Sequence, residues 1–104
     1  MTKKEFFTKK IIPRIEERIF EYDFQLIRNQ YILERLVEEL EELKRTPVFR
    51  AGDNIEKILK EREERRRELE QQIEEVKRNI AYLPLMKEEE EKFLEYFKNL
   101  IEKF

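Results

Sequence analysis

The sequence has 104 residues and nearly balanced charge, with 23 Lys and Arg against 25 Asp and Glu. Charged residues make up 46% of it, and it has one Gly and three Pro, a composition typical of long helices rather than of sheets. This length fits a single domain, 1–104, with a thin core. The absence of His and Cys removes the commonest acids, bases and nucleophiles, so we expect no enzymatic activity, no cofactor or metal and no small-molecule substrate.

The apolar residues are too scattered to form a segment that reaches into a membrane. No run approaches the roughly 18 apolar residues that a span requires, and the N-terminus lacks the apolar core of a signal peptide. We therefore expect a cytoplasmic protein without a membrane partner.

The N-terminal part of the sequence predicts a short helix followed by a long one. Thr2 and Glu5 have the spacing of a capping box, which indicates a short helix within 1–12. Pro13 limits that helix and predicts a kink or a fresh start between Ile11 and Arg14, because proline lacks a backbone donor and clashes with the preceding turn. Helix one is expected over 14–45.

The only Gly and a second Pro mark a loop over 46–54. An acidic N-cap at Asp53 then favours a second long helix, helix two, over 54–83. Pro84 predicts the end of helix two and the start of a separate helix three over 85–104.

A heptad pattern runs through both long helices and predicts that they pack on each other. Folding one stripe back onto the other gives an antiparallel hairpin, with Leu26 near Ile73 and Leu36 near Arg62. The predicted fold is therefore all-α, a long helical hairpin plus a C-terminal helix, as a three-helix bundle or a dimeric helical bundle. The stripe of helix one is Ile15, Ile19, Tyr22, Leu26, Asn29, Leu33, Leu36, Leu40 and Leu43, and that of helix two is Ile55, Leu59, Arg62, Arg66, Leu69, Ile73, Val76, Ile80 and Leu83.

Helix one carries a second apolar stripe, which points about 150° away from the first. A helix that is apolar on two nearly opposite sides is normally covered on both. Helix three of the same chain is one candidate to cover the second stripe. The alternative is that a second copy or another protein covers it. The predicted interaction face consists of Phe20, Phe24, Ile27 and Tyr31 on helix one and of Phe93, Phe97, Leu100 and Phe104 on helix three.

Three polar residues interrupt the heptad seam. Asn29 is a candidate for fixing register or oligomeric state, or it faces the edge of the seam. Arg62 and Arg66 either lay their stems along the apolar stripe while their heads reach nearby carboxylates, or hold a carboxylate of a partner. The segment Arg62–Arg67 is also the nearest approach to a nucleic-acid patch, although neighbouring Glu residues offset its charge.

The layout of the chain resembles a known family. The break leading into GDNIEKILKEREERRRELEQQIEEVKRNIAYL, followed by EEEEKFLEYF, is similar to the N-terminal coiled-coil part of phage late-gene transcriptional regulators of the ArpU and RinA type. The resemblance covers about residues 15–97 and implies a role in transcription regulation through protein contact. The helix-turn-helix that follows in that family is absent up to Phe104, so the chain is a fragment or has only the interaction half, and no functional residue is carried over.

Together these patterns predict a non-catalytic coiled-coil protein–protein interaction module, of phage origin by resemblance, that acts by dimerisation or by docking on a protein partner. The alternative is a nucleic-acid-associated transcriptional regulator that uses Arg62–Arg67 and the basic N-terminus.

Overall fold

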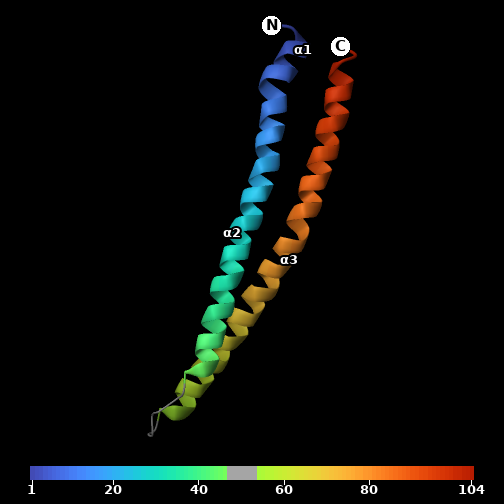
Figure 1. The fold of residues 1–104 in the computed structure, drawn as a ribbon. Coiled ribbons are helices and arrows are strands. Elements are labelled where there is room, and N and C mark those ends of the chain that lie inside the picture. Colours follow the sequence, from blue (N-terminus) through green and yellow to red (C-terminus); the bar gives the residue numbers. More distant parts are fainter. Residues whose placement is uncertain (47–53) are drawn as a thin grey trace. The chain divides into compact units, whose positions relative to one another are not determined.

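The computed structural model describes residues 1–46 and 54–104, and it is all-helical in these ranges, as expected (Figure 1). The elements in chain order are α1 (Lys3–Phe6), the π-helical turn η1 (Phe7–Ile11), α2 (Ile12–Arg45) and α3 (Ile55–Ile101). None of the helices in the two described ranges has the length and apolarity that crossing a membrane would require.

The chain forms two compact units, each containing part of α2 and part of α3. Unit 1 comprises Met1–Arg28 and Ile80–Phe104, and unit 2 comprises Asn29–Asn79. Each unit has its own contacts between the two helices, and each is described separately.

The contacts of unit 1 run in antiparallel order. Arg18 of α2 pairs with Glu90 of α3 at 3.1 Å. Five residues further along α2, Asp23 pairs with Lys87, which precedes Glu90 in α3, at 2.8 Å. As the residue number rises along α2, it therefore falls along α3.

Unit 2 shows the same order of contacts. Glu39 of α2 pairs with Arg65 of α3, and the carbonyl of Leu43 accepts a hydrogen bond from Arg62. The acidic end of α2 thus lies beside the basic stretch of α3 inside this unit.

Helix formation begins at the N-terminus with the predicted cap. The hydroxyl of Thr2 accepts a hydrogen bond from the backbone N–H of Glu5 at 3.2 Å, which satisfies one of the free donors of the first turn. The helix does not stop before Pro13. Instead the chain widens into η1, where the N–H of Ile12 bonds to the carbonyl of Phe7, and a wide turn relieves the clash that a proline ring imposes on an ordinary α-turn.

The two long helices are separated by the segment between Arg45 and Ile55. Helix α2 ends at Arg45 with basic residues in its last turn, which suits the negative end of the helix dipole. Helix α3 begins at Ile55 with Glu56 in its first turn. Most of the predicted loop and its proposed N-cap Asp53 lie outside the described residues.

The predicted break at Pro84 is wrong, because α3 continues through this residue to Ile101. Helix three is therefore the C-terminal part of α3, and the three-helix bundle that depended on a separate helix is wrong for this chain. A proline inside a helix loses one hydrogen bond and clashes with the carbonyl four residues earlier. Apolar burial in unit 1, at Ile15 of α2 and Ile101 of α3, favours the continuous helix, and the ion pairs of Lys87 with Asp23 and of Glu90 with Arg18 add a smaller contribution.

The predicted heptad seam accounts for most of the burial. In unit 1 the buried apolar residues are Ile15 and Ile101, and in unit 2 they are Leu69, Ile73 and Val76. Every other seam residue of α2 is half-buried. In α3 the exception is Leu59, which is 50% exposed; its neighbour Ile58 is half-buried instead.

The predicted pairing of Arg62 with Leu36 is also wrong. Arg62 bonds to the carbonyl of Leu43, one heptad further along α2. A heptad stripe looks the same after a shift of seven residues, because apolar positions again face apolar positions. The pattern therefore predicts that the two helices pair, but it does not distinguish between registers that differ by one heptad.

Candidate interaction surface

The most exposed apolar surface of α2 lies in unit 1. Phe20, Phe24 and Ile27 are 69%, 56% and 64% exposed, and their spacing of four and three residues puts them on one side of the helix. We call these three residues the outer face. The half-buried seam residues Ile19 and Tyr22 lie on a different side of α2, so most of the outer face lies away from the packing against α3. Phe20, at one edge of the face, borders a hollow together with Leu94 of α3.

The prediction that helix three of the same chain covers this face is wrong. The outer face stays exposed, as does Tyr31, which belongs to unit 2 and is 62% exposed. Because α3 runs on through Pro84, its C-terminal part has no turn with which to fold over the far side of α2.

The aromatic residues near the C-terminus meet a different partner, Phe7. The ring of Phe7 lies 5.3 Å from that of Phe97 and 5.8 Å from that of Phe104, and Phe93 stacks on Phe97 at 5.9 Å. We call these four residues the aromatic end cluster. Phe93 and Phe104 remain exposed, and Phe97 and Leu100 are half-buried.

Phe7 was not among the predicted site residues, because the expected helix boundary at Pro13 separated it from the heptad stripe. The signal that points to it is the Phe6–Phe7 doublet, whose rings are 6.2 Å apart. The basic N-terminus contributes to the same cluster, since the ammonium of Lys3 lies 5.6 Å from the centre of the Phe104 ring, a cation–π distance.

Three charged residues, Glu17, Glu21 and Arg28, border the outer face on one side and are exposed. Glu21 and Arg28 are seven residues apart, so they lie on the same flank of α2. No ion pair is formed by any of the three within the described part of the chain. An apolar face edged by unpaired acidic and basic side chains has the apolar centre and polar rim of a protein interface.

Unit 1 also has two shallow hollows beside the helices. One, of about 530 Å³, is bordered by Phe20, Ile19 and Leu94 but otherwise mainly by carboxylates. The other, of about 400 Å³, lies at Tyr22, Tyr82, Leu85 and Met86. Both are open to solvent and edged by glutamates, so neither offers the enclosed apolar pocket with convergent polar groups that small-molecule sites have.

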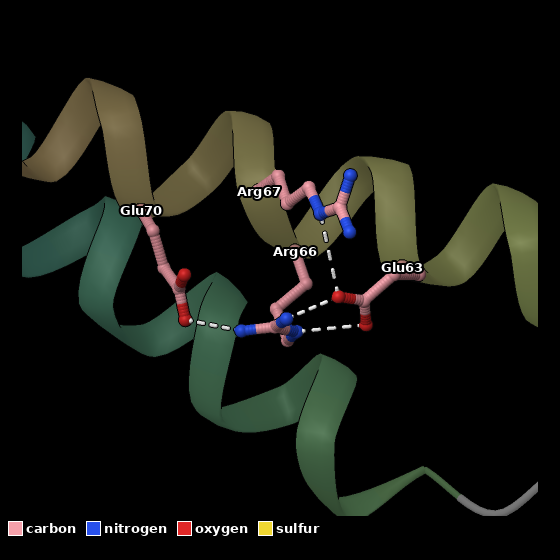
Figure 2. Close-up of polar contacts among 4 residues, drawn as sticks. All are labelled: Glu63, Arg66, Arg67 and Glu70. Carbon is pink, nitrogen blue, oxygen red and sulfur yellow. Dashed lines mark hydrogen bonds and ion pairs between the residues drawn. The ribbon is translucent and has the colours of Figure 1, made fainter.

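The arginine segment of unit 2 is neutralised within the chain. Figure 2 shows Arg66 between two carboxylates, with Nε 2.9 Å from Glu63 and a terminal nitrogen 2.8 Å from Glu70. Arg67 lies 3.5 Å from Glu63 in the same view. A phosphate would have to displace these carboxylates, which argues against the use of this segment for nucleic-acid binding.

The polar seam residues favour the interpretation that arginine stems cover the apolar stripe. Arg62 and Arg66 are half-buried, and their guanidinium groups bind the Leu43 carbonyl and the carboxylates of Glu63 and Glu70. Their partners thus come from the same chain. Asn29 is half-buried, as a seam position requires, and its proposed role in fixing register stays a prediction.

These contacts shift the pKa values of the groups involved. The hydrogen bond from Arg66 holds the pKa of Glu63 below its ordinary value of 4.5. The hydrogen bonds that Arg66 donates to Glu63 and Glu70 raise the pKa of Arg66, and the bond that Arg65 donates to Glu39 raises that of Arg65. All three groups are therefore charged throughout the physiological range.

A titration followed by carboxyl NMR should give Glu63 a pKa below 4.5. Its contribution to stability should be complete above that value and should disappear as the pH falls through the lower pKa of the folded state. Arg66→Gln should return the pKa of Glu63 towards 4.5, whereas Arg78→Gln, fifteen residues from Glu63 along α3, should leave it unchanged. A Glu63 that titrates at its ordinary value in the unaltered protein would contradict this prediction.

In the described ranges, no group of three or more acidic side chains is placed to hold a metal ion. The resemblance to the phage regulators of the ArpU and RinA type stays a prediction, because nothing in the structure bears on it. No protein-family model, curated protein or solved structure matches this chain.

Proposed function

We propose that this chain is a non-catalytic protein–protein interaction module, and that the outer face of α2 is its binding surface. The exposure of Phe20, Phe24 and Ile27 on one side of a helix carries the proposal. The largest contiguous apolar patch on a soluble monomer is often functional, as a site that binds a protein or another ligand. Large aromatic side chains also contribute most of the energy in protein interfaces, because they bury much area with few rotatable bonds.

The packing of α2 makes this surface available without any unfolding. The seam side of α2 holds Ile15 buried and is taken up by intramolecular packing, so the helix is fixed while its outer face stays accessible. A rigid helix face loses little conformational entropy on binding. We propose that the module works in the cytoplasm, and its resemblance to phage regulators favours a role in transcription control through protein contact.

Phe24→Glu tests the proposal. The variant should keep the helical content and thermal stability of the unaltered protein, because residue 24 is exposed, and it should lose association with any partner, because a buried unpaired carboxylate is strongly unfavourable in an interface. Association is measured as molar mass by sedimentation velocity over a wide range of concentrations. Tyr96→Glu is the matched control, since Tyr96 is an equally exposed aromatic residue, at 64%, on α3.

A photo-reactive phenylalanine at position 24 extends the test to partners other than the chain itself. Cells that produce the protein should yield covalent adducts from position 24 that are missing from position 96. The proposal fails if position 24 gives neither self-association nor a site-dependent adduct.

A further inference from the structure

We infer that the outer face of α2 is covered by a second copy of this chain, packed antiparallel across a two-fold axis, with Glu21 of each copy beside Arg28 of the other. This inference rests on the proposed function and names the partner. It follows from the positions of five residues on one helix, all within unit 1: Phe20, Glu21, Phe24, Ile27 and Arg28.

The apolar residues of the outer face are arranged almost symmetrically about Phe24. Phe20 precedes it by four residues and Ile27 follows it by three. When a second α2 is turned end for end about an axis through Phe24, Phe20 faces Ile27 of the other copy and Phe24 faces its own equivalent. The two-fold thus places apolar residues opposite apolar residues along the whole face, as a closed isologous interface requires.

The charges on the flank are complementary under the same operation. Glu21 and Arg28 lie within about 20° of each other around the helix and roughly 10 Å apart along it. In an antiparallel pair, the same flank of both helices meets, so the acid of each copy lies beside the base of the other. Two ion pairs form for each dimer, and both residues are exposed and make no ion pair within the described part of the chain.

A parallel arrangement brings together charges of the same sign. It would set the flank that carries Glu17, Glu21 and Arg28 against the opposite flank of the other copy, which carries Glu16 and Asp23. Asp23 is already paired with Lys87, so Arg28 would be the one base on this side of the pair against the carboxylates of Glu16, Glu17 and Glu21. Like charges in an interface suppress the wrong orientation, which leaves the antiparallel one.

The size of the face sets the strength of association that is expected. At 150–250 Å² for each large side chain, the exposed parts of Phe20, Phe24 and Ile27 amount to roughly 400 Å² per copy. The total of about 800 Å² is below the roughly 1,200–2,000 Å² of stable interfaces and in the range of weak, transient ones, so the dimer should form reversibly and its population should rise with concentration.

Charge reversal is the first test. Glu21→Arg alone and Arg28→Glu alone should each raise the dimer dissociation constant about tenfold, because each replaces two attractive pairs by two repulsive ones. The double variant Glu21→Arg/Arg28→Glu should return it to within about threefold of the original. Circular dichroism checks that every variant keeps its helical content, and sedimentation velocity gives the dissociation constants.

Disulfide trapping tests the orientation independently, and the chain has no native cysteine to interfere. A mixture of Phe20→Cys and Ile27→Cys proteins should form a mixed disulfide dimer under mild oxidation, because only facing positions come within bonding distance. Neither variant alone should cross-link. Cross-linking of each variant with itself would establish a parallel dimer and overturn the inference.

The outcomes separate this inference from the proposed function. If Phe24→Glu abolishes the dimer but neither charge reversal changes its dissociation constant, the antiparallel pairing is wrong, and the outer face remains a binding surface. If the protein stays monomeric at all concentrations, a second copy is not what covers the outer face. The site-dependent adducts at position 24 then decide the proposed function alone.

Discussion

Leu69→Ala should lower the free energy of unfolding by about 2–5 kcal/mol, the range for a fully buried leucine. Leu69 is the only side chain of the described residues with no exposed surface, and it lies in unit 2 between the half-buried residues of the seam. Truncation to alanine removes apolar contacts and leaves a cavity. The two helices can close this cavity only in part, because their other side chains hold them in place.

The matched control is Leu59→Ala, which makes the same change in the same helix and the same unit. Leu59 is 50% exposed, so its truncation should lower the free energy of unfolding by less than about 1 kcal/mol. Urea denaturation followed by far-ultraviolet circular dichroism gives both values. Equal effects at the two positions would show that Leu69 is not part of the core.

Pro84→Ala should raise the free energy of unfolding by up to about 3 kcal/mol, the difference between proline and alanine inside a helix. In α3 the residue at this position has no N–H to donate, and its ring crowds the carbonyl of Ile80. Alanine restores the hydrogen bond and relieves the crowding, while the contacts of α3 with α2 on either side stay in place.

Pro13→Ala serves as the control for that change. Pro13 is the second residue of α2 and follows the π-helical turn η1, where the backbone already accommodates a proline. Its replacement should have the smaller effect in thermal unfolding. A Pro84→Ala variant that is less stable than the unaltered protein would show that the proline shapes α3 for its packing.

The fold class and the seam could be predicted because both follow from a periodic pattern within each helix. Ile15, Leu69, Ile73 and Val76 are buried where the heptad requires it. The continuity of α3 could not be predicted, because Pro84 is a strong local signal for a break. It is overruled by tertiary contacts, such as Asp23 with Lys87, that join residues distant in the sequence.

Most residues of the candidate site could be predicted from the sequence, but the contacts that they make could not. Phe20, Phe24 and Ile27 form one exposed face as their spacing indicates, whereas Phe97 meets Phe7 instead of covering that face. In an uninterrupted α-helix, Phe7 would lie about 80° around the helix from Ile15. The π-helical turn contains one additional residue, which brings Phe7 to within about 20° of the side of the helix that carries Ile15. A regular helical period does not include this additional residue, so the position of Phe7 could not be predicted from the sequence pattern.

The aromatic end cluster has a consequence for how the chain opens. The first and last turns of a helix usually fray independently, because each is held only by its own hydrogen bonds. Here Phe7, close to the beginning of the chain, rests on Phe97 and Phe104, close to its end. Fraying of either terminus removes the apolar partner of the other, so we expect amide protons at the two ends of the sequence to exchange with solvent as one cooperative unit.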